Sequence, residues 1–315
     1  SFILPSRSIT MLVVVAIGGN AILRKNEKPS VDAQLKNMKK LSKQLVGIAK
    51  RHRLVITHGN GPQVGNELIR VEEALGKAYP LPLYTCVAES QGEIGYMIEQ
   101  SLQNELRKQR MKRSVVTILT QTLVDRKDKS FNKPTKPIGP YYTKSETHHL
   151  KKKGFVMAMD ARGGYRRVVP SPKPLKIIEA DTIKKLIKDN VIVVAAGGGG
   201  IPVYGNNKLE GVDAVIDKDL ASSCLAKSIG ADAMLILTDV SNAYLNYKKP
   251  KQIKLTKIKA SKLKKHMNHF PAGSMGPKIE ASIDFVEHGG KKAIITSPEN
   301  AEKALKGKTG TVITK

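Results

Sequence analysis

The feature of this sequence that most constrains its fold is a repeated unit of a short apolar run, a glycine-rich turn and an amphipathic helix. The first unit is Leu12–Ile17, which runs into Gly18, Gly19 and Asn20 and precedes a helical pattern at 31–51. Continuous apolar strands that alternate with helices are typical of a mostly parallel sheet covered on both faces. Further runs lie at 54–57, 114–120, 191–196, 233–237, 293–296 and 311–314. The pattern predicts an α/β chain.

Three segments do not follow this rhythm. Residues 125–175 hold six prolines and several basic residues, and this length without a clear pattern predicts a small inserted subdomain, or lid. Residues 1–10 precede Met11, and we expect them to be an expression remnant or disordered. Residues 248–265 hold nine lysines, for which we expect a solvated loop and helix rather than an interaction tail.

The charge balance allows two interpretations. The sequence has 54 Lys and Arg against 27 Asp and Glu, a net charge of +27, which fits either a polyanion binder or a lysine-rich surface. Lysines outnumber arginines by 42 to 12 and aromatic residues are only 4%, which disfavours a reader of nucleic acid. Apolar windows are too short for a membrane helix. Cys86 and Cys224 lack metal-site spacing, so we expect reduced thiols in the cytoplasm and no nucleic-acid or membrane partner.

Three glycine clusters follow predicted strands. They are at 18–20, at 59–61 after His58, and at 197–200. In parallel sheets, ligands bind beyond these strand ends. Glycine lets backbone N–H groups approach an anion, although a tight turn also needs glycine for its geometry. The chain has no Walker loop and no dinucleotide fingerprint, so the clusters predict a different phosphate-binding fold. His58 fits a structural turn residue better than a base.

Three lysines differ from the rest because their backbones are locally fixed. Lys136 lies among prolines, Lys218 stands between Asp217 and Asp219 at the start of a predicted helix, and Lys278 opens a helix after glycines. Phosphoryl transfer needs positive charge on the equatorial oxygens and aligned reactants, which such lysines supply. A helix N-cap is the alternative interpretation of the two aspartates.

One more loop, after 233–237, holds good turn formers and could instead line a nucleotide pocket. Its residues are Thr238, Asp239, Val240 and Asn242, with Tyr244 and Tyr247 as candidate contacts to the base or ribose.

Several long motifs, in order along the chain, resemble those of carbamate kinases. They are Val15–Ala21, Ile56–Gly65, Ser90–Met97, Asn132–Pro140, Arg167–Pro172, Gly211–Ala221 and Ala272–Lys278, so the resemblance spans residues 11–315. The sequence departs from the family at 162–166, where Tyr165 stands in place of a tryptophan and an arginine is displaced. It also departs at Glu89 and Glu93, in a helix that packs in the dimer interface of relatives.

The resemblance implies the amino-acid-kinase fold, a three-layer αβα sandwich on an open, mainly parallel sheet with a small inserted lid. It implies a lobe for carbamate and carbamoyl phosphate at 11–190 and a nucleotide lobe at 191–315. The expected protein is a cytoplasmic homodimer that uses Mg²⁺ with ATP or ADP in the reversible reaction ATP + carbamate ⇌ ADP + carbamoyl phosphate, usually run toward ATP in arginine breakdown through the arginine deiminase pathway. A kinase of the same fold for acetylglutamate or aspartate is the alternative, and a non-enzymatic polyanion binder is a more distant one.

The resemblance also implies roles for single residues. Lys136, Lys218 and Lys278 are expected on the transferring phosphoryl group, with Asp219 organising them. Carbamate and phosphate are expected at Gly18, Gly19, Asn20, Gly59, Asn60 and Gly61. The nucleotide is expected at Gly198, Gly199, Gly200, Asp217, Thr238, Asp239, Val240, Asn242, Tyr244 and Tyr247. The protein itself is expected to supply no metal ligand, because Mg²⁺ enters on the nucleotide phosphates.

Overall fold

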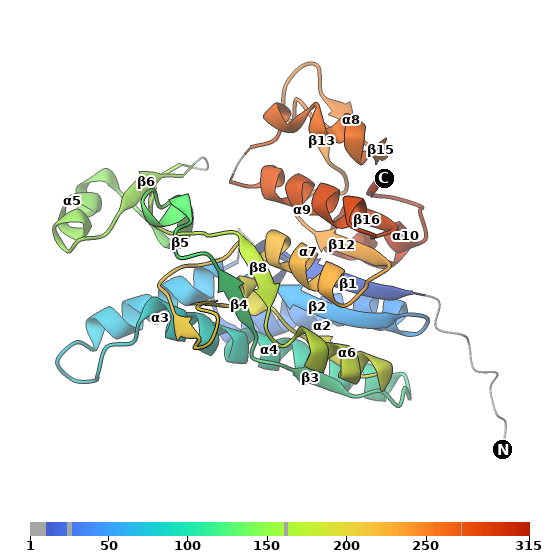
Figure 1. Ribbon diagram of the computed structural model, residues 1–315, viewed down its shortest axis with the longest axis horizontal. Coiled ribbons are helices and arrows are strands. Elements are labelled where there is room, and N and C mark those ends of the chain that lie inside the picture. Colours follow the sequence, from blue (N-terminus) through green and yellow to red (C-terminus); the bar gives the residue numbers. More distant parts are fainter. Residues whose placement is uncertain (1–10, 24–26, 161–162, 272) are drawn as a thin grey trace.

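The centre of the molecule is an eight-stranded sheet (Figure 1). The computed structural model describes residues 11–23, 27–160, 163–271 and 273–315, so residues 1–10 and Arg162 lie outside the described part. All neighbouring strands are parallel except β16 and β17. In spatial order the strands are β15 (Lys257–Lys259), β17 (Thr311–Thr314), β16 (Lys292–Thr296), β12 (Ala233–Leu237), β1 (Leu12–Ile17), β2 (Arg53–His58), β9 (Ile192–Val194) and β3 (Val115–Thr117).

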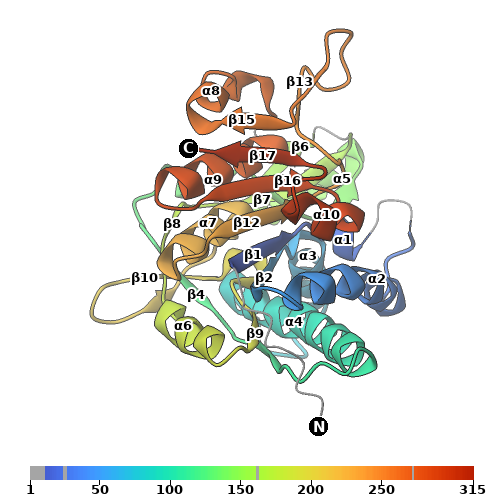
Figure 2. The same cartoon turned by 90° about the vertical axis from the view of Figure 1, so that its right-hand side faces the viewer.

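Helices cover both faces of this sheet, which confirms the predicted three layers (Figure 2). Along β1, successive side chains enter opposite cores, because strand side chains alternate in direction. One core packs α2 (Val31–Ala49), α4 (Leu83–Lys108) and α10 (Ala301–Leu305) on the sheet. The other core packs α6 (Ala180–Lys188), α7 (Lys218–Ser228), α8 (Ala260–Lys264) and α9 (Met275–Glu287). Every residue of β1 is buried, so its apolar run is continuous.

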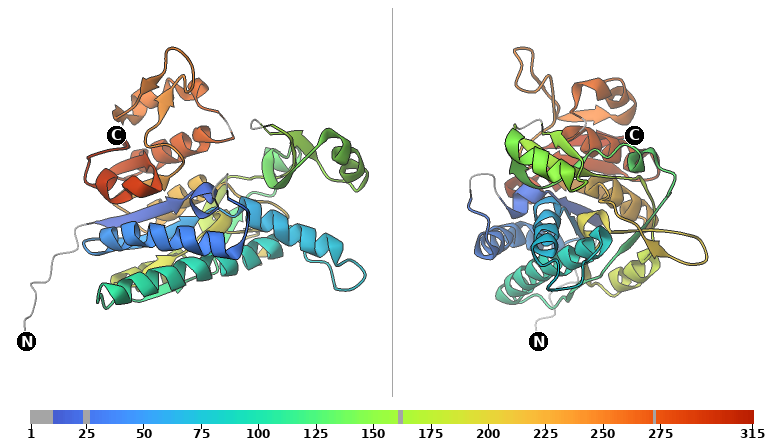
Figure 3. Two further views of the ribbon diagram at one scale, coloured as in Figure 1. Left: turned by 180° about the vertical axis from the view of Figure 1, so that it is seen from behind. Right: turned by 90° about the vertical axis from the view of Figure 1, so that its left-hand side faces the viewer.

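The inserted subdomain, here called the lid, is narrower than the predicted 125–175. It is a three-stranded sheet of β5 (Lys136–Tyr142), β7 (Tyr165–Val169) and β6 (Met157–Met159) with helix α5 (Lys144–Lys152). Figure 3 shows the lid, in green, standing apart from the orange segment around residue 250. The flanks of the predicted insert join a second sheet that the sequence did not reveal, made of β11 (Glu210–Gly211), β10 (Ile201–Tyr204), β4 (Gln121–Val124) and β8 (Pro174–Ile177).

The lid is docked on helix α3 (Gly61–Glu73), which leaves the end of β2. A Cβ on Gly65 would lie only 2.0 Å from the Cα of Gly139, so the two backbones touch. Arg167 of the lid donates to Glu72 at 2.7 Å. The lid strand that carries Lys136 therefore has a fixed place above the sheet edge.

Some other segments differ from the secondary structure expected from the sequence. The run at 114–120 forms only the short strand β3, because the chain turns at 118–120 to enter the second sheet. The lysine-rich 248–265 segment is not only loop and helix. It includes β15 at the edge of the main sheet and β14 (Ile253–Lys254), which pairs with β13 (Tyr244–Leu245). Strand β9 lies between β2 and β3, so the sheet itself has no boundary at residue 190.

The remaining elements are short. They are α1 (Gly19–Ile22) and the single 3-10 turns η1 (Lys129–Phe131), η2 (Gly197–Gly199), η3 (Met267–His269) and η4 (Pro298–Asn300). Within the described part of the chain, no helix has both the length and the apolarity that crossing a bilayer requires.

Candidate active site at the carboxyl edge of the sheet

The three lysines singled out in the sequence meet at the carboxyl edge of the sheet. Lys218, at the start of α7, donates to Asp219 Oδ1 at 2.5 Å, and Lys278, in the first turn of α9, donates to Asp219 Oδ2 at 3.0 Å. Lys136, the first residue of β5 in the lid, donates to Asp217 Oδ2 at 2.6 Å. Three cations from three separate parts of the chain therefore surround two carboxylates.

Asp219 is the centre of this cluster, and its side chain is only 3% exposed. Burial disfavours its charged form, but Lys218 and Lys278 outweigh burial and hold the pKa of Asp219 below its usual range. Burial lowers the pKa of Lys218 despite Asp219. Burial also opposes the charge on Lys278, yet Asp219 and Asp217 raise the pKa of Lys278 above its ordinary value. At neutral pH the cluster thus holds both Asp219 and Lys278 in their charged forms.

Asp217 has two partners. Its Oδ1 accepts from the backbone N–H of Asp219 at 2.9 Å, which caps the N-terminus of α7. Its Oδ2 accepts from Lys136 of the lid. The structure thus contains the helix cap that was one interpretation of this aspartate, while its expected contact with the nucleotide stays a prediction. Burial would raise the pKa of Asp217, but Lys136 holds it below the usual value.

The first two glycine turns lie beside the lysines. The Gly18 N–H donates to Leu237 O at 3.1 Å, and a Cβ on Gly18 would lie 2.8 Å from that oxygen. A Cβ on Gly59 would lie 3.3 Å from Lys218 Cδ and 3.5 Å from the backbone nitrogen of Gly19. The two turns and the lysine stem are therefore in close contact, and only glycine fits comfortably between them.

His58 is a structural residue. Its side chain is 1% exposed, and burial lowers its pKa to about 4. Nδ1 donates to the carbonyl of Gly59 at 3.1 Å, so Nε2 of the neutral ring is the unprotonated nitrogen. This Nε2 lies where a Cβ on Gly197 would come within 2.4 Å. The imidazole supports the turn, as its position in the sequence indicated.

Side chains and a backbone carbonyl of this protein pack closely against the four glycines at 197–200. A Cβ on Gly198 would lie 2.2 Å from Asn60 Nδ2, and one on Gly200 would lie 2.0 Å from Thr122 Oγ1. Gly199 similarly faces a backbone carbonyl, that of Ile216. All four glycines are buried. This packing gives no support to the expected nucleotide role of Gly198, Gly199 and Gly200.

The 238–247 segment lies elsewhere, because β2 and β1 separate the end of β9 from the end of β12. Asn242 donates to Leu255 O at 3.0 Å and is buried. The rings of Tyr244 and Tyr247 lie 5.6 Å apart. Val240 is half-buried in the same loop. Asn242 therefore stabilises the loop, and the tyrosines form a pair at its end.

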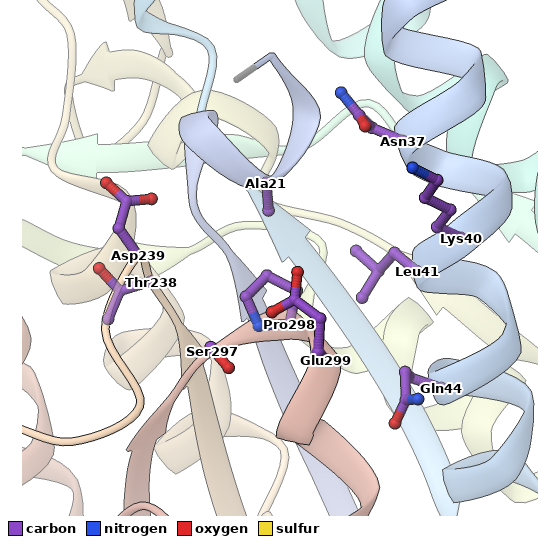
Figure 4. Close-up of a pocket in the computed structure, with 10 residues that line it drawn as sticks. All are labelled: Ala21, Asn37, Lys40, Leu41, Gln44, Thr238, Asp239, Ser297, Pro298 and Glu299. Carbon is purple, nitrogen blue, oxygen red and sulfur yellow. The ribbon is translucent and has the colours of Figure 1, made fainter. Parts of the chain in front are cut away.

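Thr238 and Asp239 line a cavity of ≈ 320 Å³ on the α2 side of the sheet edge (Figure 4). Helix α2 and the η4 turn form its other walls. Asp239 also contributes to the raised pKa of Lys278. This aspartate is thus electrostatically connected with the lysine cluster.

Sequence reasoning missed several buried polar residues that hold the loops. Asn60 donates to Ser90 at 2.9 Å, and Gln91 exchanges two hydrogen bonds with the backbone of Thr120. Ser90 and Gln91 belong to a motif at 90–97 that was noted in the sequence, but nothing in it indicated these contacts. Arg166 is 7% exposed and donates to Gly139 O at 2.7 Å. This arginine anchors the lid backbone in the region that departs from the expected motif.

The two unexpected glutamates lie on α4. Glu89 is exposed and Glu93 is half-buried. Burial raises the pKa of each carboxyl group, and the nearby Glu67 raises it further. Glu67, Glu89 and Glu93 thus lie near one another, and Arg70 is beside them.

Comparison with known proteins agrees with this geometry. A model of the amino acid kinase family matches residues 11–297. Carbamate kinase from Pyrococcus horikoshii is 48% identical over 309 residues, covering 96% of this chain and 98% of that protein. Carbamate kinase 1 from Enterococcus faecium is also 48% identical, with coverages of 96% and 99%.

A solved structure of carbamate kinase from Giardia lamblia bound to AMP-PNP superposes with a TM-score of 0.89 at 47% identity, covering 96% of this chain and 98% of that chain. The same enzyme bound to citric acid gives a TM-score of 0.92 at 46% identity, with the same coverages. These matches and the lysine cluster show that the chain is a kinase of the amino acid kinase family and groups with the carbamate kinases.

Proposed function

We propose that this protein is a carbamate kinase that catalyses ATP + carbamate ⇌ ADP + carbamoyl phosphate. The observation that carries the proposal is the convergence of Lys136, Lys218 and Lys278 on the half-buried Asp217 and the buried Asp219 at the sheet edge. A transferring phosphoryl group spreads its charge over three equatorial oxygens. Three lysines from three directions match that distribution and are held before the substrate arrives.

Each lysine has a separate task in this mechanism. Lys218 and Lys278 flank the phosphoryl group in transfer, and Asp219 holds both ammonium groups at fixed positions. Lys136 enters from the lid and supplies charge on the carbamoyl phosphate side. In the turns at 18–20 and 59–61, the N–H groups of Gly18 and Gly59 already donate to Leu237 O and Ile17 O. The N–H groups of Gly19, Asn60 and Gly61 would be the ones offered to the substrate oxygens. Docking of the lid excludes water, which protects labile carbamate.

Nucleotide binding is assigned to the segment after β12. Thr238, Asp239 and Val240 follow the strand next to β1, and Tyr244 and Tyr247 offer aromatic faces for the base or ribose. The AMP-PNP complex of the Giardia relative supports ATP as the phosphoryl donor. Among the described residues, no cluster of three or more His, Cys, Asp or Glu could hold an ion. Since lysines already occupy Asp217 and Asp219, Mg²⁺ fits best on the nucleotide phosphates, whose charge it neutralises.

The family resemblance also suggests a biological setting for this enzyme. We infer a homodimer, a cytoplasmic location and a flux toward ATP in arginine breakdown through the arginine deiminase pathway. The two cysteines support a reducing compartment, because both are free and buried.

The experiment is ATP formation from carbamoyl phosphate and ADP with Mg²⁺, measured with a coupled assay. Lys136→Met and Lys218→Met should each lower kcat by at least about 100-fold. Lys208→Met is the matched control, since this lysine is 83% exposed and pairs with Glu210 rather than with Asp217 or Asp219, and it should keep full turnover. Absence of turnover in the folded wild type would refute the proposal. Phosphorylation of acetylglutamate or aspartate would favour the alternative kinase, and salt-sensitive DNA binding without turnover would favour a polyanion binder.

A further inference from the structure

Two buried hydroxyl groups connect the end of strand β2 with the second turn of α7. Thr57 Oγ1 and Ser222 Oγ lie 2.6 Å apart, although the residues are 165 positions apart in the sequence. Ser222 Oγ also lies 2.6 Å from the backbone carbonyl of Lys218. Both side chains are 0% exposed. Thr57 is the penultimate residue of β2, and the Gly59 turn follows it directly.

The direction of these hydrogen bonds is determined by chemistry. A carbonyl oxygen only accepts, so the single proton of Ser222 goes to Lys218 O. Ser222 must then accept from Thr57, whose proton is available. The result is a directed chain, Thr57 O–H to Ser222 O–H to Lys218 C=O. Without Ser222, the buried Thr57 hydroxyl would lose this hydrogen bond, whereas Ser222 without Thr57 would still donate to Lys218 O.

These hydrogen bonds from Thr57 through Ser222 to Lys218 O set the distance between β2 and α7, and this distance affects the position of the Lys218 side chain. The stem of Lys218 passes over Gly59, where even a single Cβ would lie 3.3 Å from its Cδ. The gap between β2 and α7 is therefore just wide enough for that stem. The hydroxyl pair joins the same strand and helix, two residues before Gly59 and four residues after Lys218. A helix residue as small as serine lets α7 approach the strand closely there.

We propose that Thr57 and Ser222 are positioning residues that fix the height of Lys218 over the Gly59 turn, and thereby its aim at the transferring group. This inference rests on the proposed role of Lys218. It goes further by assigning a kinetic function to two residues that touch no substrate.

The same helix supplies a matched control. Ser228 donates to Cys224 O at 2.8 Å, again to the residue four positions earlier. Ser228 lies at the far end of α7, and the strand hydroxyl of Thr57 bonds only the Ser222 end. Ser228→Ala thus removes only a hydrogen bond within the helix. Ser222→Ala removes such a bond and also the hydrogen bond from Thr57.

The experiment measures kcat, KM for ADP and carbamoyl phosphate, and thermal unfolding for four single variants and one double variant. Ser222→Ala and Thr57→Val should each lower kcat about tenfold, since a small misplacement of a reacting group is costly, with both KM values within twofold of wild type. The double variant should lose no more than either single one. Thr57→Ser keeps the hydroxyl and should restore kcat. Ser228→Ala should match wild-type kcat.

Three results would overturn the inference. The first is unchanged kcat in Ser222→Ala with a lowered unfolding temperature, which would make the pair a stability element only. The second is an equal loss in Ser228→Ala. The third is failure of Thr57→Ser to restore kcat. A wild type that lacks turnover would instead contradict the proposed reaction, and this separates the two failures. Ser222→Ala places alanine, the best helix former, in α7, so folding is retained and the test stands even if Thr57→Val is unstable.

Discussion

The contact between Gly65 and Gly139 leads to a sharp prediction for the lid. Replacing Gly65 by alanine would place a Cβ 2.0 Å from Gly139 Cα and 2.3 Å from its nitrogen. These are backbone atoms, so no side chain can turn away. The two segments must separate by about 1.4 Å before the contact reaches an ordinary 3.4 Å.

That displacement occurs three residues from Lys136 along β5. The bond from Lys136 Nζ to Asp217 is 2.6 Å long, and an added 1.4 Å takes it beyond hydrogen-bond range. A misplacement of about 1 Å costs on the order of 100-fold in rate. We therefore expect Gly65→Ala to lower kcat by about 100-fold in the coupled assay.

Stability should respond much less. Overpacking costs about 1–3 kcal/mol, and alanine in a helix recovers roughly 0.5–1 kcal/mol. Gly47→Ala is the matched control, since it is also a helix glycine but its Cβ would meet the flexible carboxylate of Glu302. This control should keep wild-type kcat. Full activity in Gly65→Ala, or an equal loss in Gly47→Ala, would refute the reasoning.

Three further predictions concern single groups. The pKa of His58 is about 4 in the folded chain and about 6.5 in the unfolded chain, so the unfolded state binds a proton more readily as the pH falls. Urea unfolding should therefore show that the wild type loses about 3 kcal/mol of stability between pH 7.5 and 4, and that His58→Asn does not show this loss. Identical pH profiles for the two proteins would contradict this. Burial raises the pKa of Cys86 to about 11 and that of Cys224 above its usual value. Ellman's reagent should therefore detect no fast-reacting thiol in the native protein and two thiols in denaturant. A fast-reacting thiol in the native protein would show that a cysteine is accessible. Asp217→Asn keeps the helix cap, so its unfolding temperature should stay close to that of the wild type. The variant loses the ion pair to Lys136, so kcat/KM for carbamoyl phosphate should fall at least tenfold. An unchanged kcat/KM would show that the ion pair is dispensable.

The strands of the main sheet were predictable where they are buried on both faces. For β1 and β12, which are buried throughout, the apolar runs match the structure residue for residue. The second sheet was not predictable, because β4 and β8 are short and partly polar. Their place in a sheet depends on partners up to about 80 residues away in the chain.

The residues of the candidate site were likewise only partly predictable from the sequence. The three lysines could be selected because proline, aspartate or glycine neighbours fix their backbones locally. Their partners could not, since Lys136 and Asp217 are 81 positions apart and meet only through the fold. The four glycines at 197–200 correctly indicated a close approach to the backbone. The side chains of Asn60 and Thr122 make this approach in the structure, while a nucleotide role for these glycines stays a prediction.

The strand order also has a consequence for how the chain is made. Strand β1 is the centre of the sheet, with β2 on one side and β12 on the other. On a ribosome adding about 5–20 residues per second, β12 emerges roughly 10 to 40 s after β1. During that time one edge of an entirely apolar strand has no native partner, and such an edge is a template for wrong pairing. Nascent chains should therefore engage a chaperone until about residue 237 has emerged.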